Sequence, residues 1–165
     1  MDIDVTLRGR HFKAAPSAPQ DVFWVASNLR EEDRLELERW YEMSPLEVIR
    51  MSLASSTMAW TAYRTDGMPV AIWGVAMASG LYQTGVPWMV GTPFINESLG
   101  DFYRFSKYYD EIMGRYYREL FNYVDASYTG ALRWLERLGY SSKKEVTSIK
   151  NYKFLLMHKD TANVR

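Results

Sequence analysis

The feature that most constrains the fold is an apolar stripe between Leu99 and Tyr117. Its members recur at three- and four-residue spacing, the period of an amphipathic helix that packs on a sheet: they are Phe102, Phe105, Tyr109, Ile112, Met113 and Tyr116. Short runs rich in β-forming residues stand on both sides of the stripe in the sequence. We therefore expect a long helix laid on a sheet, in an α/β or α+β domain.

The segment before this stripe carries two helix start signals. Residues 22–26 form a short apolar run that predicts a buried strand, after which Asn28 would cap a helix over about residues 29–41. The clearer signal is Ser44-Pro45-Leu46-Glu47, which combines an N-cap hydroxyl, a proline at the first helical position and a capping-box glutamate. It predicts a second helix that ends near Ser55.

The remaining elements are mostly strands. Residues 60–64 and 69–78 form a predicted hairpin with Gly67 in its turn, and Gly74 indicates a bulge or the close approach of another backbone. Residues 86–90 predict a further strand, as do residues 120–126 and 145–159. Residues 129–138 predict a helix that Gly139 terminates. The expected order is β-α-α-β-β-β-α-β-α-β.

Length and composition indicate a single domain without covalent or metal crosslinks. The 165 residues are 47% hydrophobic and include no cysteine and two histidines, too few for the usual zinc sites. We expect an arm or lead-in strand at 1–20, one domain at 21–160 and a tail at 161–165. Twenty basic residues balance twenty acidic ones, which argues against nucleic-acid binding, and no apolar run is long enough to span a membrane. The polar start is not a signal peptide.

Common catalytic motifs are absent or incomplete. Residues 80–85 have the glycine spacing of a phosphate-binding P-loop, but Val86 and Pro87 stand where Lys and Ser or Thr are required. There is no G-x-G-x-x-G or G-x-S-x-G motif, and neither histidine lies in a catalytic motif. A triad assembled across the fold is not excluded by sequence. The acidic pairs Glu31-Glu32 and Asp110-Glu111 are interpreted as solvated helix faces.

Residues 120–140 carry a family resemblance. A buried strand, a loop and a helix that ends in Leu138-Gly139-Tyr140 resemble the C-terminal half of the GNAT acetyltransferase fold, and the order of the preceding elements agrees. The resemblance implies a mixed central sheet, splayed between its fourth and fifth strands, with helices on both faces. In that fold the gap receives the pantetheine arm of acetyl-CoA. Here those strands would be residues 86–90 and 120–126.

A narrower resemblance covers about residues 20–142. The segments 122–125, 132–135 and 138–140, together with Leu29, Arg30, Asp33 and residues 87–92, resemble the small acetyltransferase-like virion morphogenesis or internal virion proteins of T-seven-like podophages. This resemblance implies a role in building the phage particle, in the host cytoplasm or the virion.

The chain departs from active GNAT enzymes in three features: the diphosphate-binding loop, the cofactor asparagine and the proton-donating tyrosine. Those enzymes bind the CoA diphosphate through a glycine-rich loop and a helix N-terminus, but here Pro93 lacks an N–H group and Glu97 adds negative charge. Tyr128 replaces the usual cofactor asparagine. Leu135 replaces the tyrosine that protonates the leaving thiolate. The resemblance thus implies that the means of holding and discharging the cofactor are lost.

No residue is assigned a catalytic role, and no cofactor or metal is expected. The candidate cleft consists of Trp88, Val90, Gly91, Thr92, Asn122, Tyr123, Asp125 and Tyr128. For each of these a structural role stands beside the functional one: Asn122 would satisfy backbone groups across the gap, Asp125 would stabilise a turn, and the aromatic residues would pack in the core.

We therefore expect a non-catalytic component of virion morphogenesis. One alternative is an active acetyl-CoA-dependent N-acetyltransferase that modifies a host or phage amine, and the other is an inhibitor that binds a host protein. The expected partners are phage structural or assembly proteins, a second copy of the chain, or that host protein. Tyr103, Tyr108, Tyr116 and Tyr117 are expected to form the partner surface on the helix at about residues 100–118.

Overall fold

An eight-stranded mixed sheet forms the centre of the computed structural model, which describes residues 3–161. The strand order is β1-β2-β3-β4-β5-β6-β8-β7, and every neighbouring pair is antiparallel except β5 and β6. The strands span Leu7–Arg8 (β1), Phe12–Pro16 (β2), Ser56–Arg64 (β3), Pro69–Ser79 (β4), Thr84–Gly91 (β5), Glu119–Asp125 (β6), Ser141–Ile149 (β7) and Tyr152–Asp160 (β8).

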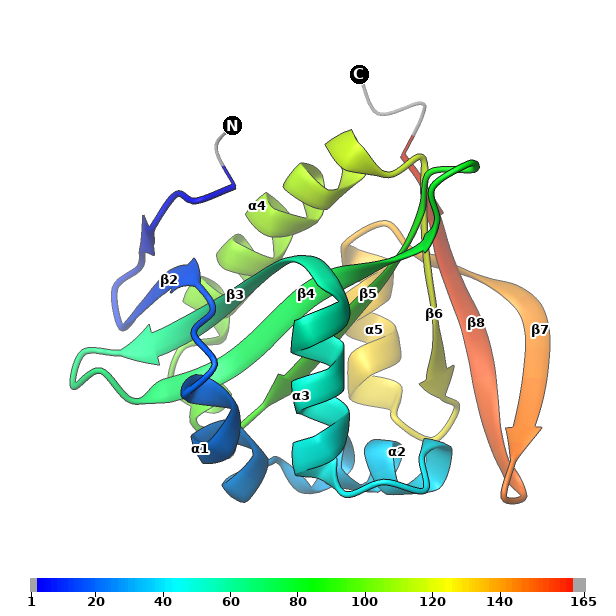
Figure 1. Cartoon of the computed structure of the whole chain (residues 1–165), viewed down its shortest axis with the longest axis horizontal. Helices are drawn as coiled ribbons and strands as arrows, with labels where there is room; N and C mark the ends of the chain where they lie inside the picture. Colours follow the sequence, from blue (N-terminus) through cyan, green and yellow to red (C-terminus); the bar gives the residue numbers. More distant parts are fainter. Residues whose placement is uncertain (1–2, 162–165) are drawn as a thin grey trace.

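Helices cover both faces of the sheet (Figure 1). They span Asp21–Ser27 (α1), Glu31–Trp40 (α2), Pro45–Ser55 (α3), Leu99–Tyr116 (α4) and Thr129–Arg137 (α5), and a 3₁₀ helix, η1, spans Pro93–Glu97. On one face, α1 and α3 pack against Ile72 and Val90. On the other face, α4 and α5 pack against the opposite side of the same strands, including Trp73. The layered α+β arrangement expected from the sequence is confirmed.

Several local predictions are also confirmed. Ser44 and Glu47 form the complete capping box of α3, with Pro45 in its first turn. The amphipathic stripe forms α4, in which Phe102, Phe105, Tyr109 and Ile112 are buried. Gly139 follows α5 with a φ of 94°, a conformation that favours glycine. At Gly74, an added Cβ would overlap the carbonyl oxygen of Met58, which explains the absence of a side chain there.

The prediction of a strand at residues 22–26 is wrong, because these residues form α1. Val22 and Val25 are buried three positions apart while Phe23 is exposed, which is the pattern of a one-sided helix. Asn28 does not cap the next helix either. Its side-chain amide donates to the carbonyl of Trp24 at the end of α1, and α2 begins after Arg30 without a side-chain cap.

Both ends of the chain contribute hairpins to the sheet. Residues 1–20 were expected to form an arm or one strand, whereas β1 and β2 form a hairpin whose second strand pairs with β3. The single β-like stretch predicted at 145–159 is two strands, β7 and β8, joined at Lys150 and Asn151, which both have positive φ. Most of the predicted tail lies outside the described residues, but Thr161 is buried and its N–H donates to the carbonyl of Arg118.

The four tyrosines predicted to form a partner surface do not share one exposed face. Tyr117 is buried and its hydroxyl lies 2.7 Å from that of Thr57, so it belongs to the core. Tyr103 packs edge-on against Trp134, and Tyr108 packs edge-on against Tyr109. Among these four, Tyr116 alone is classed as exposed.

Two general findings apply to residues 3–161. No described helix is long and apolar enough to cross a membrane. Within the same part of the chain, no cluster of three or more His, Cys, Asp or Glu side chains could hold a metal ion.

Candidate functional site

The site is built where β5 and β6 separate. These parallel strands pair only at Thr84 with Glu119 and Gly85 with Leu120, and then diverge. This is the splay that the fold resemblance implied between residues 86–90 and 120–126. Separating two strands leaves the N–H and C=O groups of the facing edges without a ladder partner, and an unpaired buried group costs about 1–3 kcal/mol. Side chains beside the gap must therefore form hydrogen bonds with these backbone groups if the strands are to stay apart.

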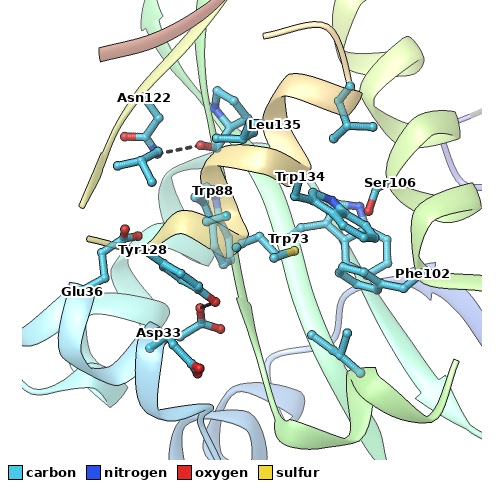
Figure 2. Close-up of a pocket in the computed structure, with 18 of the residues that line it drawn as sticks. Asp33, Glu36, Trp73, Trp88, Phe102, Ser106, Asn122, Tyr128, Trp134 and Leu135 are labelled. Carbon is cyan, nitrogen blue, oxygen red and sulfur yellow. Dashed lines mark hydrogen bonds between the residues drawn. The ribbon is translucent and has the colours of Figure 1, made fainter. Parts of the chain in front are cut away.

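Asn122 of β6 satisfies groups on both edges of the gap. Its Nδ2 donates to the carbonyl of Pro87 on β5 at 2.7 Å, and its Oδ1 accepts from the N–H of Tyr123 at 2.7 Å. Figure 2 shows the first of these bonds crossing the gap. Asn122 thus replaces strand pairing at the narrow end of the gap. This is the structural role predicted from the sequence, in which Asn122 satisfies backbone groups across the gap.

Two acidic residues of α2 satisfy the edges where the gap is wider. Oε2 of Glu36 accepts from the N–H of Asp125 on β6 at 2.9 Å. Oδ2 of Asp33 accepts from the N–H of Gly91 on β5 at 2.7 Å, while the Gly91 carbonyl accepts from the N–H of Arg30 at 2.8 Å. Sequence reasoning did not assign either carboxylate to the site. The two residues are three positions apart, so both lie on one face of the helix. This spacing was the only sequence signal that the two carboxylates act together.

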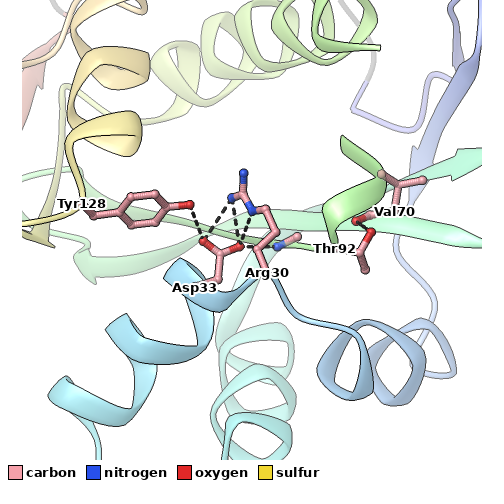
Figure 3. A network of polar contacts seen from close by, with 6 residues as sticks. Arg30, Asp33, Val70, Thr92 and Tyr128 are labelled. Carbon is pink, nitrogen blue, oxygen red and sulfur yellow. Dashed lines mark hydrogen bonds and ion pairs between the residues drawn. The ribbon is translucent and has the colours of Figure 1, made fainter. Parts of the chain in front are cut away.

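Asp33 is held in a closed polar network (Figure 3). Its carboxylate accepts from the guanidinium of Arg30, at 2.9 Å in the ion pair, and from the hydroxyl of Tyr128 at 2.9 Å. Burial raises the pKa of Asp33, although Arg30, the Gly91 N–H and Tyr128 oppose the shift. Burial and the nearby Asp33 raise the pKa of Tyr128. This network fixes the start of α2 against the end of β5.

Glu36 is the more open of the two carboxylates. Its Oε1 has no hydrogen-bond partner among the described residues, and the side chain lines the cavity described next. Desolvation raises the pKa of Glu36 to about 7, opposed by the Asp125 N–H and assisted by the carboxylates of Asp33 and Asp125. Near neutral pH this carboxyl can therefore hold or release a proton.

A cavity of about 720 Å³ passes through the sheet at the splay. This volume is within the usual range for small-molecule sites. On one side of the sheet it is lined by Glu36 and Trp88, and on the other by Phe102 of α4 and Trp134 of α5 (Figure 2). Helix α5 is strongly amphipathic, yet none of its residues is fully buried, because its apolar side faces this space. The apolar face of α5 is therefore only partly buried, and part of it lines the cavity.

The predicted cleft residues are brought to the same region, but they divide into two groups. Trp88, Asn122, Tyr123 and Tyr128 line the cavity. The other four have structural contacts instead. Val90 packs in the core beneath α1 and α3, and Gly91 is bound by Asp33 and Arg30. Thr92 donates its hydroxyl to the Val70 carbonyl at 2.9 Å. Asp125 accepts hydrogen bonds from Ser127 and forms an ion pair with Arg39 at 2.7 Å.

The corner between β5 and α4 is held together by contacts within the chain. The N–H groups of Thr92, Ile95 and Ser98 already donate to carbonyls of Val70, Thr92 and Ile95. Ile95 closes over Gly91, where an added Cβ would overlap its side chain. In the first turn of α4, Asp101 accepts from the N–H groups of Arg10, His11 and Phe12. The Asp101 carboxylate thus binds the turn between β1 and β2 from the first turn of α4, and three nearby donors are committed to carbonyls.

Polar groups also lie at the α4 side of the cavity. Asp110 accepts from the hydroxyl of Tyr140 at 2.7 Å and pairs with Lys159, whose Nζ also donates to the carbonyl of Leu138 at 2.8 Å. Trp88 donates its indole N–H to Ser56 at 2.8 Å. By contrast, Nε1 of Trp73 is buried in the cavity wall and has no hydrogen-bond partner within the described residues.

Comparisons with known proteins identify the fold. The chain matches the ribosomal-protein-S5-alanine acetyltransferase from Vibrio fischeri with a TM-score of 0.70, at 11% identity, covering 98% of this chain and 100% of that one. The chain has a GNAT-like fold. A spermidine N-acetyltransferase from Vibrio cholerae, in complex with CoA and spermine, matches with a TM-score of 0.68 at 9% identity, covering 93% and 98% of the two chains.

A third structure, an acetyltransferase of the GNAT family from Bacillus anthracis, matches with a TM-score of 0.66 at 9% identity, covering 95% of this chain and 99% of that one. No family model and no curated protein sequence matches the chain. The similarity therefore establishes the α+β GNAT-like fold, and any chemistry has to be argued from the residues.

The corner beside β5 does not fit the diphosphate of a CoA molecule. A diphosphate at a helix start needs several free N–H donors and no competing negative charge. Here Pro93 has no N–H, Thr92, Ile95 and Ser98 donate elsewhere, and Asp101 holds a negative charge in the first turn. The chain therefore has splayed strands and a cavity, and these groups at the corner beside them do not favour a bound anion.

Proposed function

We propose that this chain is a binding protein with a GNAT-like fold, and that it does not transfer acyl groups from CoA. The observation that supports this most is the corner between β5 and α4, where Asp101 stands in the first helical turn and three backbone donors are already used. Binding a diphosphate there would set its negative charge close to the carboxylate of Asp101. The cavity behind this corner remains available for another ligand.

The resemblance to podophage proteins supports the biological part of the proposal, a role in virion morphogenesis. This resemblance rests on the sequence segments at 122–125, 132–135 and 138–140. Purification of a tagged copy from infected cells tests it. Recovery with capsid, portal or core proteins supports an assembly role, whereas recovery with one host factor early in infection favours an inhibitor.

The enzymatic part is tested by a thiol-release assay with acetyl-CoA and a panel of amines and amine-bearing peptides. The proposal expects no release of CoA above the rate without protein. Turnover that depends on protein concentration and on the added amine contradicts it.

One observation favours acyl transfer as a second candidate function. Glu36 lines the cavity with one oxygen that has no hydrogen-bond partner among residues 3–161, and a carboxyl whose pKa is about 7 is suited to take a proton from an ammonium group. If turnover is found, Glu36→Gln should reduce kcat by about 100-fold or more, in the range typical of a general base. Glu38→Gln is the matched control, because Glu38 lies on the same helix outside the cavity and pairs with Arg34.

A further inference from the structure

One stretch of β5 keeps backbone groups that nothing in the described chain satisfies. Alternate residues of a strand direct their N–H and C=O groups to the same side. Pro87 and Gly91 both use gap-facing groups, since the Pro87 carbonyl accepts from Asn122 and Gly91 is bound by Asp33 and Arg30. Met89 lies between them, so its N–H and C=O face the gap too. No hydrogen bond from Met89 to β6 is found among residues 3–161.

The cavity beside Met89 has a second unsatisfied donor. Trp73 is 6% exposed, lines the cavity, and carries an indole N–H without a partner in the described chain. A buried donor is normally paired with protein or with another acceptor. The Trp73 nitrogen itself is closed off from the cavity, so the groups that an amide-bearing chain in the gap would satisfy are the N–H and C=O of Met89.

The charges around the cavity indicate which kind of chain fits. Asp33 is paired with Arg30, and Asp110 with Lys159, so these charges are compensated. Glu32 and Glu36 line the α2 side without an ion pair among the described residues. This side therefore favours a cationic group and disfavours a phosphate. The pantetheine arm of CoA also carries amides, but the phosphates attached to that arm in CoA would meet the corner between β5 and α4, where Asp101 carries a negative charge.

We propose that the cavity binds an extended peptide of a partner protein, which adds as a short strand beside Met89 and places a lysine or arginine next to Glu36. This inference rests on the proposed binding function and names its partner chemistry. Main-chain hydrogen bonds to an exposed strand edge supply affinity in such complexes, and pockets for alternate side chains supply specificity.

The two faces of the gap predict the pattern of the peptide. Alternate side chains of an added strand point to opposite faces. One set would point to the side of the cavity that the packed rings of Phe102 and Trp134 line, and the other would point to the side of Glu36 and Trp88. The bound segment should therefore alternate apolar residues with polar residues, among them at least one lysine or arginine.

Selection from a random peptide library with the full-length protein tests this directly. The expected result is enrichment of apolar–basic alternation, followed by measurable binding of the selected peptide in calorimetry. Glu36→Gln should weaken that binding about tenfold, and Glu38→Gln should leave it unchanged. Ala131→Phe fills the cavity from α5 and should abolish binding. A peptide N-methylated at its central amide should also fail to bind, and this control leaves the protein unaltered.

Two results would overturn the inference. The first is that the library yields no peptide whose binding is lost with Ala131→Phe. The second is that the selected peptide binds equally well after N-methylation or after Glu36→Gln. These outcomes are distinct from failure of the proposed function, which is shown by acetyl-CoA turnover. If CoA is neither bound nor used and no cavity-dependent peptide is selected, this inference alone is wrong.

Discussion

At the scale of single residues, Glu36 links the protonation of the site to the stability of the fold. Its pKa is about 7 in the folded chain against a reference of 4.5, so the folded state binds more protons than the unfolded state between these values. The free energy of unfolding should therefore fall as the pH rises through this window. Above pH 7 the Glu36 carboxyl is ionised and its full destabilising effect is present. Glu36→Gln keeps an acceptor for the Asp125 N–H but removes the buried charge.

We expect Glu36→Gln to raise the free energy of unfolding by about 1–3 kcal/mol near pH 8 and to have a much smaller effect near pH 5. Urea denaturation at both pH values measures this, with Glu38→Gln as the exposed control. A variant that is destabilised more near pH 8 than near pH 5 contradicts the assignment.

Asn122 is the residue on which the narrow end of the gap depends. Asn122→Ala leaves the Pro87 carbonyl and the Tyr123 N–H without these partners, so we expect a loss of about 1–3 kcal/mol in unfolding free energy. Asn122→Asp retains an acceptor for Tyr123 but sets a carboxylate against the Pro87 carbonyl, and should not restore stability. Chemical denaturation that shows no change for Asn122→Ala would exclude this bridging role.

At the scale of elements, η1 is held against the end of β5 by side-chain packing. The side chain of Ile95 closes over Gly91, so Gly91→Ala should destabilise the chain by about 1–3 kcal/mol through overpacking. Adding Ile95→Ala should recover part of that loss, because it removes the atoms that the new methyl group meets. A double-mutant cycle by thermal denaturation checks this coupling, and simple additivity would contradict it.

The free space beside α5 makes a second prediction at this scale. Ala131 lines the cavity, whereas Ala71 is fully buried in the packed core. Ala131→Phe should therefore change the unfolding free energy by less than about 1 kcal/mol, whereas Ala71→Phe should lower it by about 1–3 kcal/mol or more. Comparable losses in both variants, measured by urea denaturation, would mean that the space beside α5 is not available.

Local sequence signals predicted elements well where the determinants were local. The capping box at Ser44 and Glu47 fixed the start of α3, and the stripe of α4 gave its buried face. The segment at α1 failed because β-forming residues were placed in a helix by burial against Ile49 and Ile72. The turn at Lys150 and Asn151 was missed because its positive φ values occur without a glycine.

The candidate site was predictable only in part. The splay and Asn122 followed from the order of elements and from the family resemblance, whereas the roles of Asp33 and Glu36 depend on how α2 docks against two strands far away in the sequence. A charged residue on a helix is usually solvated, so only the packed structure reveals that these two bind strand edges.

At the scale of the whole molecule, two neighbouring tyrosines at the C-terminal end of α4 differ in burial, one lying in the core and the other on the surface. Tyr117 is buried against Thr57, while Tyr116 is 53% exposed. Tyr117→Ala should cost about 3–5 kcal/mol and lower the Tm markedly, whereas Tyr116→Ala should change stability by less than about 0.5 kcal/mol. The reverse order of Tm values would contradict this placement, and tests of partner binding at this end of the helix should use Tyr116.

The fold has a splayed sheet with a cavity at the splay, and the corner between β5 and α4 is built from contacts within the chain. A calorimetric titration of CoA and of pantetheine into the full chain tests this most directly, because the two ligands share an arm and differ in the nucleotide and its phosphates. We predict that CoA binds no more tightly than pantetheine. Affinity for CoA that exceeds the affinity for pantetheine by about tenfold or more, a difference of about 1.4 kcal/mol, would contradict the account.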